Sequence, residues 1–268
     1  MDDAASALEP LNPDKPSSAR IYDYYLGGAH NFAADRRVAE QISAVYPDVS
    51  VIAQVNRAVL RRAVQYLADA GVRQFLDIGS GIPTVGHVHE IAQRTAPDAK
   101  VVYVDIDPVA VAHSRDILRG NAHATAIRQD LRKPDEIATH PEVVRLFDFD
   151  EPIAVLLVSM LHFVPDSADP LAIIRRLLAP LTSGSFLAIS HGTADGPLDM
   201  TASIEIYRRS GIELAFRTHT EVEALFADCE LLPPGVVWAP LWHPESTADS
   251  QHSTPENSAN YAGVGRKR

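Results

Sequence analysis

The fold is best predicted from one stretch of the sequence, Phe75-Leu76-Asp77-Ile78-Gly79-Ser80-Gly81. It reads as a short buried strand, Gln74–Ile78, that runs directly into a Gly-x-Gly turn. Glycine at positions 79 and 81 permits positive φ angles and lets a ligand approach the backbone without a Cβ in the way. A helix that opens after such a turn offers unpaired N–H groups. The stretch predicts a ligand-binding loop, with Asp77 at the strand end, where its carboxylate could accept a hydrogen bond from a cationic amine.

Strands and helices alternate on the C-terminal side of this loop. Four more buried strands are predicted, with helical segments near residues 85–94, 108–118, 134–146 and 170–178 between them: Lys100–Val104, Ala124–Arg128, Ile153–Ser159 and Phe186–Ser190. On the N-terminal side, an apolar stripe from Val51 to Leu67 predicts a helix that ends before Gly71. Strands buried on both faces and joined by helices are typical of a parallel, doubly wound sheet.

The last quarter of the chain has a different pattern. A helix is expected near Thr201–Arg209, and Thr220-x-x-Glu223 has the spacing of a capping box for a further short helix. Leu231–Ala239 and Asn260–Val264 read as two sequential strands without a helix between them, so they are expected to pair antiparallel with each other. The chain shows no internal repeat and no second-domain boundary. We therefore expect one domain over residues 19–268, preceded by a flexible N-terminal arm over residues 1–18.

The composition argues against a nucleic-acid-binding, disulfide-containing or membrane protein. The chain has 268 residues, 46% of them apolar, and 24 basic against 35 acidic residues give a net charge of −11. A negative surface repels phosphate backbones, so no nucleic-acid or anionic-membrane partner is expected. Cys229 is the only cysteine, which excludes an intrachain disulfide and a multi-thiolate metal site. The acidic start and the lack of a long apolar run predict a soluble, cytoplasmic protein.

Acidic residues at the ends of the next two strands extend the predicted site. Asp105 lies 24 residues after Gly81, about one βαβ unit onward, where a carboxylate can take both ribose hydroxyls of a nucleoside. Asp130 follows the third strand and could meet an adenine amino group. Either acid could instead be a solvated turn residue, and Asp107 reads as the N-cap of the helix that begins at Pro108. Three flanking residues are also taken as cofactor-binding: Ile106, Leu131 and Ser159.

The turn also indicates which nucleoside is bound. A dinucleotide fingerprint places a third glycine three residues after the second, but this chain has Pro83-Thr84 there. The missing glycine favours a ligand without a pyrophosphate, a condition that S-adenosylmethionine meets. A nicotinamide-dependent oxidoreductase is the alternative that Thr84 disfavours. A non-catalytic, S-adenosylmethionine-binding regulator is the second alternative.

Seven segments resemble the S-adenosylmethionine-dependent methyltransferase family first catalogued as a domain of unknown function. They are PSSARIYDYYLGGAHNFAADRRVAEQI, FLDIGSGIPTVGHVHEIA, VVYVDIDPVAVAHSR, QDLRKPDEI, VLLVSMLHFVPD, ISHGT and YAGVGRKR. The likeness runs from about Pro16 to Arg268. The RIYDYYLGG block at residues 20–28 is its most specific mark, although Tyr25 stands where leucine is expected.

This resemblance implies a Rossmann-like, class I methyltransferase fold. The doubly wound, mostly parallel sheet would have seven strands, with the C-terminal strand antiparallel. S-adenosyl-L-methionine would be the cofactor. Asp77, Gly79 and Gly81 match the cofactor loop, Asp105 the ribose acid, and Asp130 with Leu131 the adenine contact. The resemblance names no acceptor, so we expect an unidentified small molecule and leave the oligomeric state open.

Two histidines are candidates for a general base. His162 follows the fourth predicted strand and His191 the fifth, and functional residues gather at the carboxyl ends of such strands. In-line methyl transfer needs a base only if the acceptor must lose a proton. Each histidine could instead be hydrogen-bonded to backbone. His87 and His89 are expected at the surface, facing different directions, and no metal site is expected.

An aromatic block with a Gly-Gly pair spans Ile21–Phe32. One interpretation is that it packs a short helix against the sheet edge. The other is a lid over the cofactor, formed within residues 19–50, because aromatic faces attract a sulfonium cation and Gly27-Gly28 could form a hinge or a close approach. The candidate lid or substrate residues are Tyr22, Tyr24, Gly28, His30, Asn31 and Phe32.

Overall fold

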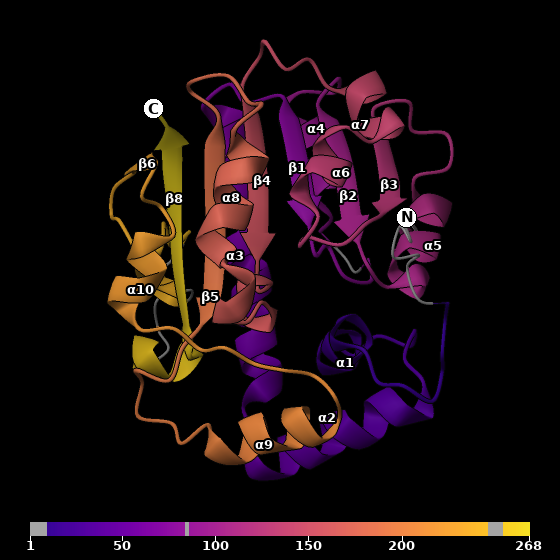
Figure 1. The fold of residues 1–268 in the computed structure, drawn as a ribbon, viewed down its shortest axis with the longest axis vertical. Helices are drawn as coiled ribbons and strands as arrows, with labels where there is room; N and C mark the ends of the chain where they lie inside the picture. The colour runs from indigo at the N-terminus through magenta and orange to yellow at the C-terminus, as the bar shows by residue number, and fades with distance from the viewer. Residues whose placement is uncertain (1–9, 84–85, 246–253) are drawn as a thin grey trace, which may run out of the picture.

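The computed structural model describes residues 10–83, 86–245 and 254–268, and eight strands of these residues form one sheet (Figure 1). The order is β3-β2-β1-β4-β5-β8-β6, and β7 pairs with β8. The first five of these are mutually parallel, whereas β8 is antiparallel to β5, β6 and β7. The strands are β1 Gln74–Ile78, β2 Lys100–Asp105, β3 Ala124–Arg128, β4 Ile153–Val158, β5 Phe186–Gly192, β6 Cys229–Leu231, β7 Val237–Trp238 and β8 Asn260–Lys267.

Helices cover both faces of the sheet, as the predicted alternation requires. The described helices are α1 Ser18–Tyr25, α2 Ala33–Val45, α3 Val49–Asp69, α4 Val88–Thr95, α5 Pro108–Ile117, α6 Pro134–Ala138, α7 Pro141–Leu146, α8 Pro170–Leu178, α9 Thr201–Arg209 and α10 His219–Ala224. One apolar core joins α6, α7, α8 and α10 to the sheet, and a second core joins α3, α4 and α5 to its other face. Because successive strand residues point to opposite faces, Leu76 lies in the first core and Phe75 in the second.

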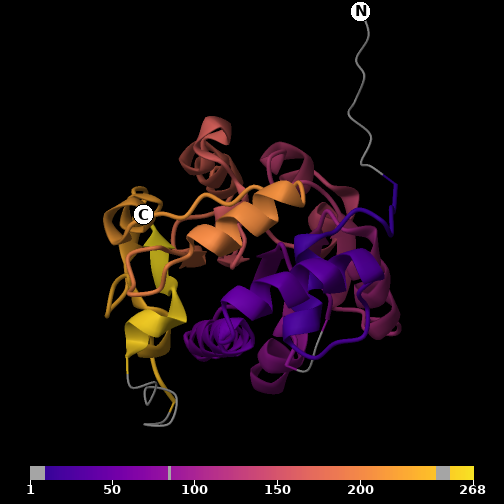
Figure 2. The same ribbon diagram turned by 90° about the horizontal axis from the view of Figure 1, so that it is seen from below.

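A third helical layer lies across the carboxyl ends of the parallel strands. It consists of α1, α2 and α9, seen at the bottom of Figure 1 and across the front of Figure 2. Ile21, Val38 and Ile42 form its buried core, and Ile206 and Tyr207 of α9 pack against them. Because ligands of doubly wound folds bind at the carboxyl ends of the strands, this layer covers the place where a site is expected.

The sheet confirms a mostly parallel α/β fold with an antiparallel C-terminal strand, but it has one strand more than expected. The segment predicted as a single strand over residues 231–239 is not continuous: β6 ends at Leu231, and β7 is formed by Val237–Trp238. Pro233 and Pro234 lie between them, and a proline has no N–H to donate to a neighbouring strand.

Two predicted helical features also differ. The helix expected over residues 134–146 is divided into α6 and α7, because Pro141 begins a new helix that His140 caps through Nδ1. The capping box of α10 is formed by Thr218 and Glu221, two residues before the predicted pair. Asp107 caps α5 as expected, and its carboxylate accepts from the N–H groups of Val109 and Ala110.

The N-terminal residues lie closer to the site than a loose arm would. Residues 10–17 run along a cavity wall, and the backbone oxygen of Lys15 accepts a hydrogen bond from Arg20. The remainder of the expected arm, residues 1–9, and Thr84 lie outside the described residues. Within the described parts, no helix is long and apolar enough to cross a membrane.

Candidate functional site

A cavity of about 720 Å³ lies between the carboxyl ends of the parallel strands and the third helical layer. Its size falls within the range of pockets that hold small molecules, about 300–1,000 Å³. We call its two halves the strand side and the helix side. The strand side is lined by residues that follow β1, β2 and β3 and by residues 158–160 at the end of β4. The helix side is lined by α1, α2, the start of α3, α9 and residues 162–165 and 211–216.

The predicted loop after β1 forms part of the strand side. Gly79 and Gly81 both have positive φ angles, +73° and +67°, as the Gly-x-Gly turn requires. A Cβ on Gly79 would collide with the side chain of Met160. Three hydrogen bonds hold the loop: the N–H groups of Gly79 and Ser80 donate to the Val104 oxygen, and Gly81 N–H donates to the Asp105 carboxylate. Gly79 therefore serves a close approach to Met160, whereas Gly81 is required for its positive φ, since nothing described lies within 4 Å of where its Cβ would be.

Asp77 is a buried carboxylate without a described hydrogen-bond donor. It is 4% exposed and lines the cavity. Burial raises the pKa of Asp77 to about 7; the positive charge of Arg57 opposes this shift and the negative charge of Asp105 adds to it. A carboxylate in this position favours a cationic ligand group, because ionisation in a buried site needs a partner.

Asp105 is held by the backbone and still has acceptor capacity. Its Oδ2 accepts from Gly81 N–H at 2.7 Å, and its Oδ1 accepts from Asp107 N–H at 2.8 Å. Burial raises the pKa of Asp105 to about 6, although these backbone hydrogen bonds oppose the shift. A carboxylate has about four lone-pair sites, so two ribose hydroxyls could still be accepted. Ile106, next in the chain, lines the cavity and is 42% exposed.

The other predicted cofactor residues also line the strand side. Asp130 forms a bidentate ion pair with Arg132, with distances of 2.6 to 3.0 Å. Burial raises the pKa of Asp130, but the hydrogen bonds from Arg132 outweigh it, so the pKa is lowered overall. Leu131 is buried beside it. Ser159 has a φ of +56°, and its N–H donates to the Oγ of Ser190.

The raised pKa of Asp77 predicts a pH-dependent affinity for a cationic ligand. Since a cation pairs with the ionised carboxylate, affinity should fall as the pH drops from about 7 toward 5, and binding near pH 6.5 should release protons. Calorimetry in buffers of different ionisation enthalpy measures this release. Asp77→Asn should bind more weakly and release fewer protons, the remainder coming from Asp105. The same proton release in Asp77→Asn would contradict the assignment.

His162 and His191 lie side by side, but only His162 lines the cavity. Their ring centroids are 5.8 Å apart. His191 is fully buried: its Nδ1 bonds to the Gly192 oxygen at 2.7 Å, and its Nε2 bonds to Arg217 at 2.8 Å. Both nitrogens of His191 are thus engaged, which leaves His162 as the histidine that can reach a ligand.

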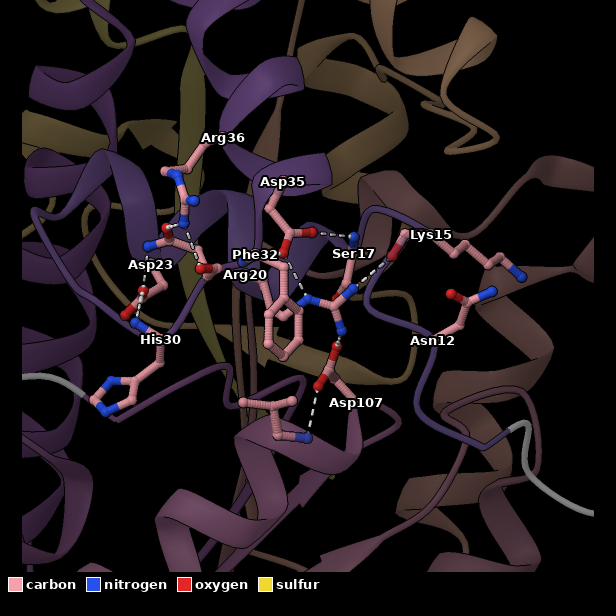
Figure 3. A network of polar contacts seen from close by, with 12 residues as sticks. Asn12, Lys15, Ser17, Arg20, Asp23, His30, Phe32, Asp35, Arg36 and Asp107 are labelled. Atoms are coloured by element: carbon pink, nitrogen blue, oxygen red, sulfur yellow. Dashed lines mark hydrogen bonds and ion pairs between the residues drawn. The ribbon is translucent and has the colours of Figure 1, made fainter.

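A buried arginine, Arg20 of α1, joins the third helical layer to Asp107, which follows β2 (Figure 3). Arg20 is 3% exposed and bridges two acids: its Nε donates to Asp35 at 2.8 Å and its Nη1 to Asp107 at 2.7 Å. Its guanidinium also lies over the ring of Phe32, 5.1 Å from the centroid. Sequence reasoning gave Arg20 no role, because nothing near it in the sequence indicates its partner Asp107, which lies 87 residues away.

Of the six candidate lid residues, only Tyr22 lines the cavity. Its hydroxyl donates to the Ala53 oxygen and accepts from Asn56, another residue that sequence reasoning missed. The others are engaged elsewhere. Asn31 and the backbone of His30 bond to Asp23, the His30 ring lies against His113, Gly28 packs against the Asp23 carboxylate, and Tyr24 and Phe32 pack within the helical layer.

The pair His87 and His89 was predicted wrongly. Their rings are stacked, with centroids 5.4 Å apart, and His89 is buried against the hydroxyl of Tyr103. His87 is the N-cap residue of α4, and its backbone N–H donates to the Glu90 carboxylate at 3.1 Å. In the described part of the chain, no group of three or more His, Cys, Asp or Glu side chains could hold a metal ion.

A family model and two solved structures are similar to this chain over nearly its whole length. A family model described as S-adenosyl methyltransferase matches residues 4–268. No curated protein matches the sequence. A DUF574 family protein from Streptomyces avermitilis is 39% identical over 96% of this chain and all of its own, with a TM-score of 0.92. A structure from Thermobifida fusca, described provisionally as a methyltransferase, is 40% identical over 95% of this chain and 96% of its own, with a TM-score of 0.90.

A more distant structure shares the fold alone. The pyocyanin biosynthetic protein PhzM is 15% identical and has a TM-score of 0.50, over 85% of this chain and 61% of its own.

Proposed function

Because this chain belongs to the S-adenosyl methyltransferase family and is an S-adenosylmethionine-dependent methyltransferase, we propose that the strand side of its cavity holds the cofactor and the helix side holds a small-molecule acceptor. The observation that carries the first half is the buried carboxylate of Asp77, to which no described residue donates a hydrogen bond, beside two glycines of positive φ. Family membership argues against the two alternatives that the sequence left open, a nicotinamide-dependent oxidoreductase and a non-catalytic regulator.

The described residues fit S-adenosylmethionine. Asp77 would accept from the cationic amine of its amino-acid part, Asp105 from its ribose hydroxyls, and Ile106 and Leu131 would contact the adenine ring. The bound cofactor supplies an electrophilic methyl group on a sulfonium. Asp130 would reach the adenine amino group only if its bidentate pair with Arg132 opens or shifts.

The chain's main contribution to methyl transfer would be positioning. Aligning two reactants can supply about 7–11 kcal/mol in the most favourable intramolecular cases. The third helical layer covers the strand side, and the buried Arg20 fixes that layer to Asp107, two residues from the proposed ribose acid. The layer would thus exclude water and orient the acceptor.

The proposal extends to the partners and the location of the protein. A cavity of about 720 Å³ suits a small molecule, and the net charge of −11 disfavours nucleic acid as the acceptor. We also propose a cytoplasmic location, because S-adenosylmethionine is a cytoplasmic metabolite and a chain with a single cysteine does not depend on an intrachain disulfide.

Calorimetry with S-adenosylmethionine, with its demethylated product and with NAD tests the proposed site. We expect the first two ligands to bind and NAD not to bind. Binding of NAD alone would overturn the proposal. A radiolabelled methyl-transfer assay over fractionated small metabolites then tests the acceptor class, and transfer only to a macromolecular fraction would contradict it.

A further inference from the structure

A chain of hydrogen bonds runs from a buried arginine to the histidine in the cavity. Arg217 is 6% exposed, and its Nη1 lies 2.8 Å from His191 Nε2. A guanidinium can only donate, so Nε2 of His191 accepts. The proton of this neutral imidazole is therefore on Nδ1, which donates to the Gly192 oxygen at 2.7 Å.

The same logic fixes the proton of His162. The N–H of Gly192 donates to His162 Nδ1 at 3.4 Å, so Nδ1 accepts and the proton of the neutral ring is on Nε2. Burial, with the nearby His191 and Arg217, lowers the pKa of His162 to about 3, so the ring is neutral at physiological pH. No described residue accepts from Nε2, and the ring lines the cavity. His162 can therefore donate a hydrogen bond from Nε2–H into the cavity, whereas the lone pair on its Nδ1 accepts from the backbone of Gly192.

Arg217 also holds the segment that carries His162. It donates to the backbone oxygens of Leu161 at 3.1 Å and Val164 at 2.9 Å, and to the carboxylate of Asp166 at 2.6 Å. These bonds lie on both sides of residue 162. The arginine therefore fixes both the backbone around His162 and, through His191 and Gly192, the tautomer of its ring.

The rest of the helix side is aromatic and rich in donors. Six aromatic side chains line it: Tyr22, Tyr25, Tyr46, Phe163, Tyr207 and Phe216. The hydroxyls of Tyr25 and Tyr207 are 3.4 Å apart, and since each phenol has one proton, one of the two remains without a described acceptor. Glu213, the one carboxylate among the described residues that line this side, is exposed.

From these contacts we infer that His162 is a hydrogen-bond donor to the methyl acceptor rather than a general base, and that the acceptor is an aromatic hydroxyl compound that binds as its oxyanion. Arg217 is the positioning residue that keeps His162 in this tautomer. The inference rests on the proposed function. The acceptor loses its proton to water before transfer. Its oxygen then bonds to the methyl carbon as the carbon–sulfur bond breaks, and the bonding pair stays on sulfur.

Nitrogen NMR tests the tautomer without any acceptor. With ring-labelled histidine, and with His162→Gln to assign the signal, we expect His162 as the Nε2–H tautomer from pH 5 to 8. Arg217→Lys should populate the Nδ1–H tautomer of His162, because a lysine cannot donate to His191 and to the backbone oxygens of Leu161 and Val164 together. The control Arg208→Lys, on the exposed face of α9, should leave the tautomer unchanged. A wild-type signal of the Nδ1–H form, or of a ring that is protonated at pH 7, would overturn the inference.

An optical probe tests the acceptor class. We choose 4-nitrophenol, which ionises near neutral pH with a change of colour, added to protein saturated with S-adenosylhomocysteine. Hydrogen bonds to a charged group favour the oxyanion by about 10- to 100-fold, so the pKa of the bound probe should fall by about one to two units. His162→Phe should lose most of this shift, and His162→Gln, which keeps an N–H donor, should retain part of it.

The outcomes separate this inference from the proposed function. With S-adenosylmethionine, we expect methyl transfer to 4-nitrophenol and none to 4-nitroaniline, a neutral molecule of the same shape. Three results would overturn the inference: nitrophenol does not bind or its pKa does not shift, the shift is unchanged in His162→Phe, or methyl is transferred to the aniline alone. In each case, calorimetric binding of S-adenosylmethionine would leave the proposed function standing. Absence of that binding would instead remove the proposed function.

Discussion

Replacement of Asp105 with alanine is expected to weaken S-adenosylmethionine binding by about a hundredfold or more. Each charge-assisted hydrogen bond contributes roughly 1.5–3 kcal/mol, and a ribose would form two with this carboxylate. The change also removes the acceptor of Gly81 N–H, which helps to hold the cofactor loop. Calorimetry of the purified variant measures the loss.

The folded state of this variant should persist. Burial raises the pKa of Asp105 from its ordinary value to about 6, so the free energy of unfolding falls as the pH rises from that ordinary value to about 6. At neutral pH, Asp105→Ala therefore removes a charged group whose burial costs free energy. Asp116→Ala, an exposed acid on α5, is the matched control and should bind normally. Unchanged affinity in a folded Asp105→Ala protein would exclude the residue from the site.

The second large effect is expected at Arg20. Arg20→Ala leaves two buried acids, Asp35 and Asp107, without their shared cation. Breaking a buried ion pair by removing one partner typically costs about 3–5 kcal/mol, so the free energy of unfolding should fall by an amount of this order. Cofactor affinity should fall too, since Asp107 adjoins the proposed ribose acid through Asp107 N–H. Urea denaturation and calorimetry measure the two losses.

A surface pair provides the comparison for this prediction. Arg119→Ala breaks an exposed pair with Asp116 and should change stability by less than about 1 kcal/mol. The variant Arg20→Ala/Asp107→Asn, which removes one of the orphaned charges, should recover part of the loss. If Arg20→Ala is as stable as Arg119→Ala, the helical layer is held by apolar packing alone.

Local patterns were sufficient to predict most of the fold and the strand side of the cavity. β1 to β5 follow from runs of apolar residues, and Gly79, Gly81 and Asp105 lie where a strand ends, which is a local property of the chain. Asp107 as a helix cap is equally local, because its partners are two and three residues away. The split of residues 231–239 could have been anticipated from Pro233-Pro234.

The helix side was not predictable in this way, because its contacts join distant segments. Arg20 meets Asp107 across 87 residues of sequence, and Arg217 meets Leu161 across 56. Neither partner carries a local signal of the other. The same holds for the hydrogen bond that turns the lone pair of His162 toward Gly192: position after a strand indicates that a histidine faces a crevice, but not which nitrogen does.

The place of β8 in the sheet has a consequence for the way the chain acquires its structure during synthesis. This strand lies between β5 and β6 and is formed by residues 260–267. The sheet therefore cannot be completed before residues 260–267 have left the ribosome. Until then, the edge of β5 and the apolar side chains that β8 later covers are open to other chains. The nascent protein therefore passes through a stage with an unpaired parallel edge, at which chaperones could act on it.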